Sequence, residues 1–166
     1  MLKVTDDSGF LAVVVPATYC GFVDRDWEYE QLMNHFRNQM KRLSLLIWGT
    51  GLEGFWNVDV QFHRSSVRGF REVSGPIELV GGTLLVTNYE NLTFVAAYED
   101  ESLPQSHEQD CLLSASDGVY CCRVIQMFDP TIAYSAEDDD PDFLIELTRP
   151  DSIPDVWTEI PWDVDN

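Results

Sequence analysis

Basic side chains are scarce in this sequence. Ten Lys and Arg stand against 29 Asp and Glu in 166 residues, which gives a formal net charge of −19 at pH 7. Residues 1–71 hold eight residues of each sign, so the whole acidic excess lies in residues 72–166. Nucleic acids and anionic membranes are bound through positive charge, and the composition therefore excludes both as partners of a general basic surface. The acidic part is either a solvating surface or a face for a basic partner.

Long apolar runs and paired cysteine motifs are also missing. No stretch approaches the roughly 20 apolar residues of a membrane helix. The apolar run at residues 10–15 is too short for a signal core, and Asp6 and Asp7 precede it where a signal peptide carries positive charge. The four cysteines show no C-x-x-C spacing, so we expect buried free thiols in a reducing compartment. These features predict a cytoplasmic protein with no membrane partner.

The motifs of common enzymes and metal sites are absent as well, with one partial match. The three histidines are scattered, and no Walker loop, G-x-S-x-G elbow or H-E-x-x-H helix occurs. Gly49 to Gly54 fits the G-x-G-x-x-G pattern, but the residues after it alternate like a strand, whereas a dinucleotide site needs a helix there. We interpret this segment as a hairpin loop. No enzyme activity, cofactor or metal is predicted. Cys20 with a histidine, and weak calcium binding by the acids at 99–101 and 137–142, remain open alternatives.

Apolar periodicity predicts a mainly β (α+β) protein. One amphipathic helix is expected early, over about residues 26–41, because its apolar side chains fall on a single stripe: Tyr29, Leu32, Met33, Phe36 and Met40. Short apolar runs separated by Gly, Asn and Asp turns are typical of antiparallel strands. They predict strands at 10–17, 43–48, 55–62, 76–80, 83–87, 92–98, 112–115, 119–127 and 143–147, with 88–91 as a turn. Hairpins are expected at 49–54, at 81–82 and at 116–118. The predicted fold is an antiparallel β-sandwich or a strongly bent sheet of about eight or nine short strands.

The length fits a single domain spanning residues 1–166. Its C-terminal segment, residues 137–166, holds eleven acids, four prolines and one arginine. Apolar residues recur within this acidic, Pro-rich segment, among them Trp157 and Ile160. We therefore expect it to pack on the domain or to extend from it.

The stretch from Ile77 to Val124 resembles a group of small β-rich bacterial proteins. It contains IELVGGTLLV at residues 77–86, then a polar acidic loop, and SDGVYCCRV at residues 116–124. This order is similar to that of nuclease inhibitors related to competence protein J and of immunity proteins encoded beside polymorphic toxins. The resemblance leaves the first 70 residues outside it. It implies a non-enzymatic inhibitor held in the cytoplasm of the producing cell.

Aromatic and acidic side chains occur together in the second part of the chain. Aromatics anchor protein interfaces, and carboxylates steer a basic partner; the alternative is that these aromatics are core residues. The predicted partner-binding residues are Glu90, Tyr98, Glu99, Asp100, Glu101, Asp155, Trp157 and Glu159.

These residues and the resemblance together predict an immunity protein that binds a cognate bacterial toxin domain. The toxin would act in the cytoplasm on a nucleic acid, a nucleotide or another phosphate-bearing substrate. The inhibitor would occlude its basic active-site cleft. The alternatives are an acidic module for another basic protein, a ligand-binding β-sandwich unrelated to toxins, and an enzyme of unrecognised type.

Overall fold

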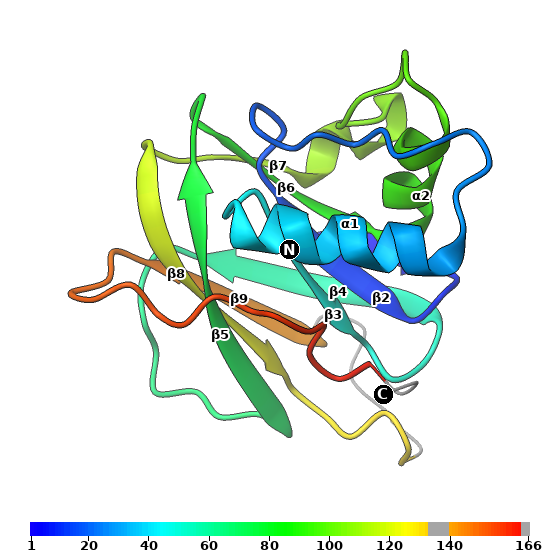
Figure 1. Cartoon of the computed structure of the whole chain (residues 1–166). Coiled ribbons are helices and arrows are strands. Elements are labelled where there is room, and N and C mark those ends of the chain that lie inside the picture. Colours follow the sequence, from blue (N-terminus) through cyan, green and yellow to red (C-terminus); the bar gives the residue numbers. More distant parts are fainter. Residues whose placement is uncertain (133–139, 164–166) are drawn as a thin grey trace.

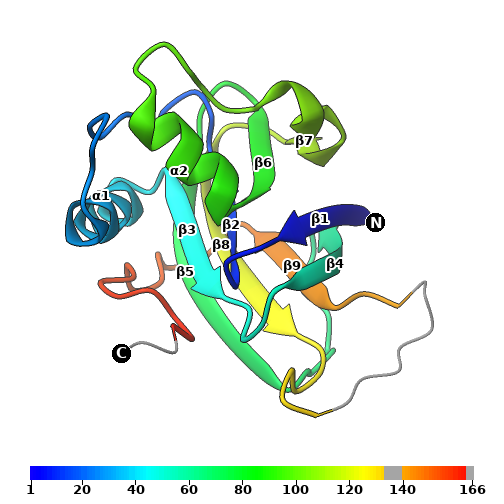
Figure 2. The ribbon, with the colours of Figure 1, turned by 90° about the vertical axis from the view of Figure 1, so that its right-hand side faces the viewer.

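The fold consists of two β-sheets with the helices on the side of the smaller sheet (Figures 1 and 2). The computed structural model of the chain describes residues 1–132 and 140–163. The five-stranded sheet has the order β1 (Leu2–Asp6), β4 (Gly54–Gln61), β9 (Phe143–Thr148), β8 (Gly118–Gln126) and β5 (Arg71–Leu79). The four-stranded sheet has the order β3 (Leu45–Gly49), β2 (Phe10–Val14), β6 (Thr83–Asn88) and β7 (Leu112–Ser114). Nine strands in the described part of the chain confirm the predicted mainly β fold class.

Most neighbouring strands are antiparallel, as predicted, but β4 and β9 run parallel. This parallel pair places β9 between β4 and β8 in the middle of the five-stranded sheet. Strand β1 lies outside the predicted set. Its apolar alternation rests on Leu2 and Val4 alone, which is too short a pattern to identify a strand.

The three predicted hairpins are wrong, although the turns themselves are present. Each of these turns joins a strand of one sheet to a strand of the other: β3 to β4, β5 to β6, and β7 to β8. Gly81 and Gly82 have φ values of 79° and 72°, so they provide the predicted positive φ. Turn residues determine where the chain reverses. They do not determine whether the next strand pairs beside the last or packs against its face.

Helix α1 (Tyr29–Lys41) confirms the predicted helix and begins three residues later than expected. The side chains of Leu32, Phe36 and Met40 are fully buried against the sheet, whereas Tyr29 at the first turn is 52% exposed. At the N-terminus, the backbone N–H of Glu28 donates to the Gln31 side chain at 2.8 Å. This bond satisfies one of the free donors at the helix start.

Helix α2 (Tyr89–Ala97) replaces the predicted turn at 88–91 and the predicted strand at 92–98. The Asn88 side chain accepts from the backbone N–H of Asn91 at 2.9 Å and caps the helix. A short apolar run fits a buried strand and a buried helix equally well. Here the Asn88 cap favours the helix. A 3₁₀ helix, η1 (Ser106–Cys111), follows before β7.

The predicted C-terminal segment contains β9, which is a central strand of the five-stranded sheet. Its later part, around residues 157–161, lies between the edge strands β3 and β5. Trp157 is buried, and its indole N–H donates to the Ser74 carbonyl of β5 at 2.8 Å. On the other edge, the N–H of Gly49 in β3 donates to the Pro161 carbonyl at 2.9 Å. The structure therefore places residues 157–161 against both sheets, while residues 137–139 and 164–166 of the predicted segment lie outside the described residues.

No helix among the described residues has the length and apolar character needed to cross a membrane.

Candidate partner-binding surface

The loop that follows α2 carries four of the predicted residues together on the surface. Tyr98 is 55% exposed, and Glu99, Asp100 and Glu101 are exposed beside it. With Arg25 and Ala97 they line a hollow of about 470 Å³. In Figures 1 and 2 this loop lies at the top of the molecule, beyond the C-terminal end of α2.

Buried polar contacts hold this loop in place. The Glu108 side chain of η1 is buried, and it accepts from the Asn91 amide of α2 and from the backbone N–H of Gln105, both at 2.7 Å. The Thr87 hydroxyl of β6 donates to the same carboxylate. Glu108 thus ties the far end of the loop to α2 and β6, so that residues 98–101 project from a fixed base.

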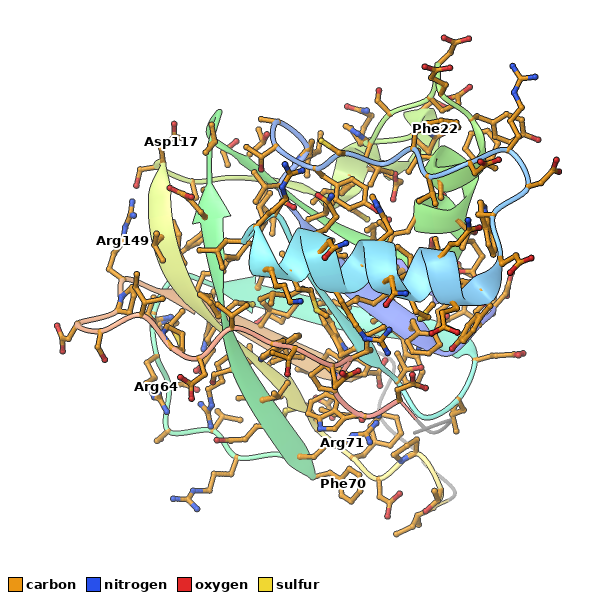
Figure 3. The ribbon with its side chains drawn as sticks, in the orientation of Figure 1. Phe22, Arg64, Phe70, Arg71, Asp117 and Arg149 are labelled. Carbon is orange, nitrogen blue, oxygen red and sulfur yellow. The ribbon has the colours of Figure 1, made fainter. Side chains whose placement is uncertain are left out.

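Two further aromatic residues belong to this surface. The rings of Phe94 and Tyr98 contact each other in a tilted arrangement, with centroids 4.9 Å apart and 44° between their planes, and both side chains are substantially exposed. The segment before α1 runs beside α2, because the N–H groups of Val23 and Asp24 donate to the Ala96 carbonyl. That segment brings an exposed Phe22 to the same region, where Figure 3 labels it.

We call this region the α2 surface. It combines three exposed aromatics with four carboxylates and one guanidinium, from Phe22, Asp24, Arg25, Phe94, Tyr98, Glu99, Asp100 and Glu101. A group of neighbouring exposed aromatic side chains, unlike a single one, often marks a surface that meets a partner. The four carboxylates give the region a negative field that favours a cationic surface.

The other predicted residues lie elsewhere. Glu90 stands in the first turn of α2, at the opposite end from Tyr98, and accepts from the Ser8 hydroxyl. Asp155 is exposed on the C-terminal segment, and Glu159 there pairs with Arg37 of α1 at 2.9 Å. Trp157 is only 8% exposed and belongs to the core, so the alternative interpretation applies to this residue. The structure therefore brings together residues 98–101 and separates them from Glu90 and from 155–159.

Phe94 and Phe22 are the contributors that sequence reasoning missed. Side chains four residues apart lie on one face of a helix, and Phe94 of α2 contacts Tyr98, the residue directly after the last helical turn. The strand interpretation of 92–98 hides that pairing because it places these residues far apart along an extended chain. The signal that could have found it is Asn88, a preferred N-cap residue placed just before the apolar run.

The described residues contain no group of three or more His, Cys, Asp or Glu side chains that could hold a metal ion. All four cysteines are free thiols, but the predicted burial holds for Cys122 alone: Cys20 is exposed, and Cys111 and Cys121 are half-buried.

Comparison with known proteins shows likeness in structure alone. No protein-family model matches the chain, and neither does any curated protein sequence. Two solved structures match over 89% of this chain and 92% of theirs. One, described as crocagin biosynthetic gene J, has a TM-score of 0.56 at 15% identity. The other is ComJ from Bacillus subtilis, an inhibitor of the DNA-degrading activity of NucA, with a TM-score of 0.49 at 8% identity. At these identities the likeness concerns the fold.

Proposed function

We propose that this protein is a non-enzymatic inhibitor that binds a basic partner protein through the α2 surface. The observation that carries the proposal is the exposed, tilted ring pair of Phe94 and Tyr98 beside Glu99, Asp100 and Glu101. An aromatic pair offers a large apolar anchor with few rotamers to fix, and the acids next to it select a cationic site. A likeness to ComJ agrees with an inhibitor but is too weak to carry the argument.

The partner we propose is a cognate bacterial toxin domain that acts in the cytoplasm on a nucleic acid, a nucleotide or another phosphate-bearing substrate. Clefts that bind phosphate are lined by positive charge, and an acidic protein of net charge −19 is attracted to them over a distance. Occlusion of that cleft by the α2 surface would block the substrate. The cytoplasm is the compartment where such protection is needed.

The test begins with the product of the gene immediately upstream, because immunity proteins of this kind are encoded beside their toxins. Co-expression should restore cell growth, and the purified proteins should form a complex. Tyr98→Ala should weaken binding by about 2 kcal/mol or more, as expected when a central aromatic anchor is truncated. The matched control is Phe62→Ala, which truncates an exposed Phe directly after β4 and should leave affinity unchanged.

Charge is tested separately from the aromatic anchor. Neutralising the loop with Glu99→Gln, Asp100→Asn and Glu101→Gln should slow association and flatten its dependence on salt, with a smaller effect on dissociation. Asp155→Asn with Glu159→Gln is the control pair on the C-terminal segment. The proposal fails if the loop variants bind and protect like the wild type while changes at Arg37, Arg64 and Arg68 abolish both.

A further inference from the structure

A second hollow, of about 470 Å³, lies at the other end of the molecule. It opens where the loop between β3 and β4 faces the segment that follows β8, drawn in yellow at the bottom of Figures 1 and 2. Its walls are apolar and include Leu52, Phe55, Trp56, Phe128, Pro130 and Ile132. A volume of this size is typical of sites for small molecules.

The apolar rim of this hollow is unusually open to solvent. Phe55 is 85% exposed and Ile132 is 65% exposed, whereas Trp56 and Phe128 form a floor with ring centroids 6.2 Å apart. Phe55 is the most exposed large apolar side chain in the described part of the chain. Among the described residues nothing removes this side chain from water, and a ligand bound in the hollow would do so.

Asp142 supplies the charge of the hollow. Asp142 carries the one charged side chain among the described residues that line the hollow, and it is only 6% exposed. The backbone N–H of Asn57 donates to one carboxylate oxygen at 2.7 Å. Burial raises the pKa of this carboxyl, and the Asn57 bond opposes that change. The remaining polar wall, the Thr131 hydroxyl, donates to Asp129 at 2.7 Å and is already engaged.

We propose that this hollow binds a small organic cation with an apolar or aromatic body and a protonated amine. The ammonium would replace the hydration that the Asp142 carboxylate loses through burial, and the aromatic walls attract a cation through their ring faces. An anion would meet both Asp142 and the field of an acidic protein. A neutral apolar ligand would leave the carboxylate without a counter-charge. The site is independent of the α2 surface, which lies on other elements at the opposite end.

Phenethylammonium is the probe, and 2-phenylethanol is its neutral counterpart of nearly the same shape. Calorimetric titration of the full chain at pH 7 should show saturable binding of the amine, at least about tenfold tighter than that of the alcohol, as expected for loss of a charge-assisted contact. Phenylacetate, with the opposite charge, should not bind.

Variants assign the binding to these residues. Asp142→Asn should weaken amine binding about tenfold and leave alcohol binding unchanged, since the amide oxygen still accepts from Asn57. Asp59→Asn, which neutralises a carboxylate on β4 outside the hollow, is the matched control. Ile132→Arg changes an exposed side chain, so folding should be unaffected, and it should abolish amine binding by placing a cation at the rim.

Three results would overturn the proposal. These are equal affinity for amine and alcohol, full amine affinity in Asp142→Asn or Ile132→Arg, and no binding of the amine at millimolar concentration. The α2-surface variants should lose toxin binding and keep amine binding. That result would show that the two sites act independently.

Discussion

The same kind of side chain serves two different purposes in two regions of this molecule. Glu146 of β9 lies on the outer face of the five-stranded sheet and is only 1% exposed. It accepts from Arg123 of β8 at 2.9 Å and from Gln61 of β4 at 2.9 Å. The Ser65 backbone N–H, on the segment that crosses this face between β4 and β5, donates to it as well at 2.9 Å. Figure 3 labels Arg64 on that crossing segment.

Glu99, Asp100 and Glu101 on the α2 surface show the opposite arrangement. They are exposed, and no ion pair with them occurs among the described residues. A carboxylate that is buried with a complete set of donors stabilises one arrangement of strands. A carboxylate left in water contributes little to folding and remains available to a partner. Burial and partners, rather than residue type, therefore separate structural acids from the candidate binding acids here.

The largest effect is expected where the buried network is broken. Glu146→Gln leaves Arg123, whose side chain is 7% exposed, with one remaining carboxylate, Glu72. Breaking a buried ion pair costs up to about 3–5 kcal/mol, and the half-exposed Glu72 compensates only part of the Arg123 charge. Urea unfolding should show a loss of that size. Glu72, the other partner of Arg123, has a side chain that is 47% exposed. Glu72→Gln should therefore lower the free energy of unfolding by no more than about 1 kcal/mol. Equal losses in the two variants would contradict the comparison.

The pH dependence follows from the same contacts. Burial opposes ionisation of Glu146, but hydrogen bonds from Ser65, Arg123 and Gln61 outweigh it and hold its pKa below the usual value. A carboxyl with a depressed pKa in the folded state stabilises the protein above its unfolded pKa. That contribution is lost as pH falls through the folded pKa. The wild type should therefore lose more stability on acidification than Glu146→Gln does.

Local patterns in the sequence predicted the helices and strands better than they predicted which strands pair with each other. The stripe of α1, the alternation of β4 and the apolar run of β9 are strong local signals, and all three elements are present. Pairing is different, because the apolar inner faces of both sheets look alike in sequence. The turn at Gly81 can therefore lead to a strand in either sheet.

The candidate site was predicted in part for the same reason. Residues 98–101 are contiguous, so their acidity and Tyr98 were visible in the sequence. Phe22 and Phe94 reach the α2 surface only through tertiary contacts, namely the bonds from Val23 and Asp24 to Ala96. Trp157 lies among acids in sequence, yet it fills the space beside Gly75 of β5, where a Cβ would stand 2.7 Å from the indole nitrogen. Sequence neighbours did not reveal that packing.

An intermediate case sharpens the comparison. Asp142 is nearly as buried as Glu146 but has a raised pKa, because burial outweighs its bond from Asn57. A raised pKa in the folded state means that ionisation costs stability as pH rises through the unfolded pKa toward the folded one. Asp142→Asn should therefore stabilise the protein at pH 7, by less than Glu146→Gln destabilises it, and the gain should vanish at a pH below the unfolded pKa. Parallel urea titrations at the two pH values measure this, and a loss of stability at pH 7 would contradict it.

The smallest effect is expected for an exposed acid that does have a partner. Glu159 pairs with Arg37 at 2.9 Å, but their side chains are 64% and 26% exposed. Water screens such a pair, and holding two long side chains together has an entropic cost, so Glu159→Gln should change the free energy of unfolding by under about 1 kcal/mol. The difference should shrink further in ~1 M salt, where the Debye length is only about 3 Å. Asp155→Asn, four residues earlier and outside the ion pairs of the described residues, is the control and should show no salt-dependent change. A loss at Glu159 as large as that at Glu146 would mean that exposure does not separate the two kinds of carboxylate, and the distinction between structural acids and the acids of the α2 surface would fall with it.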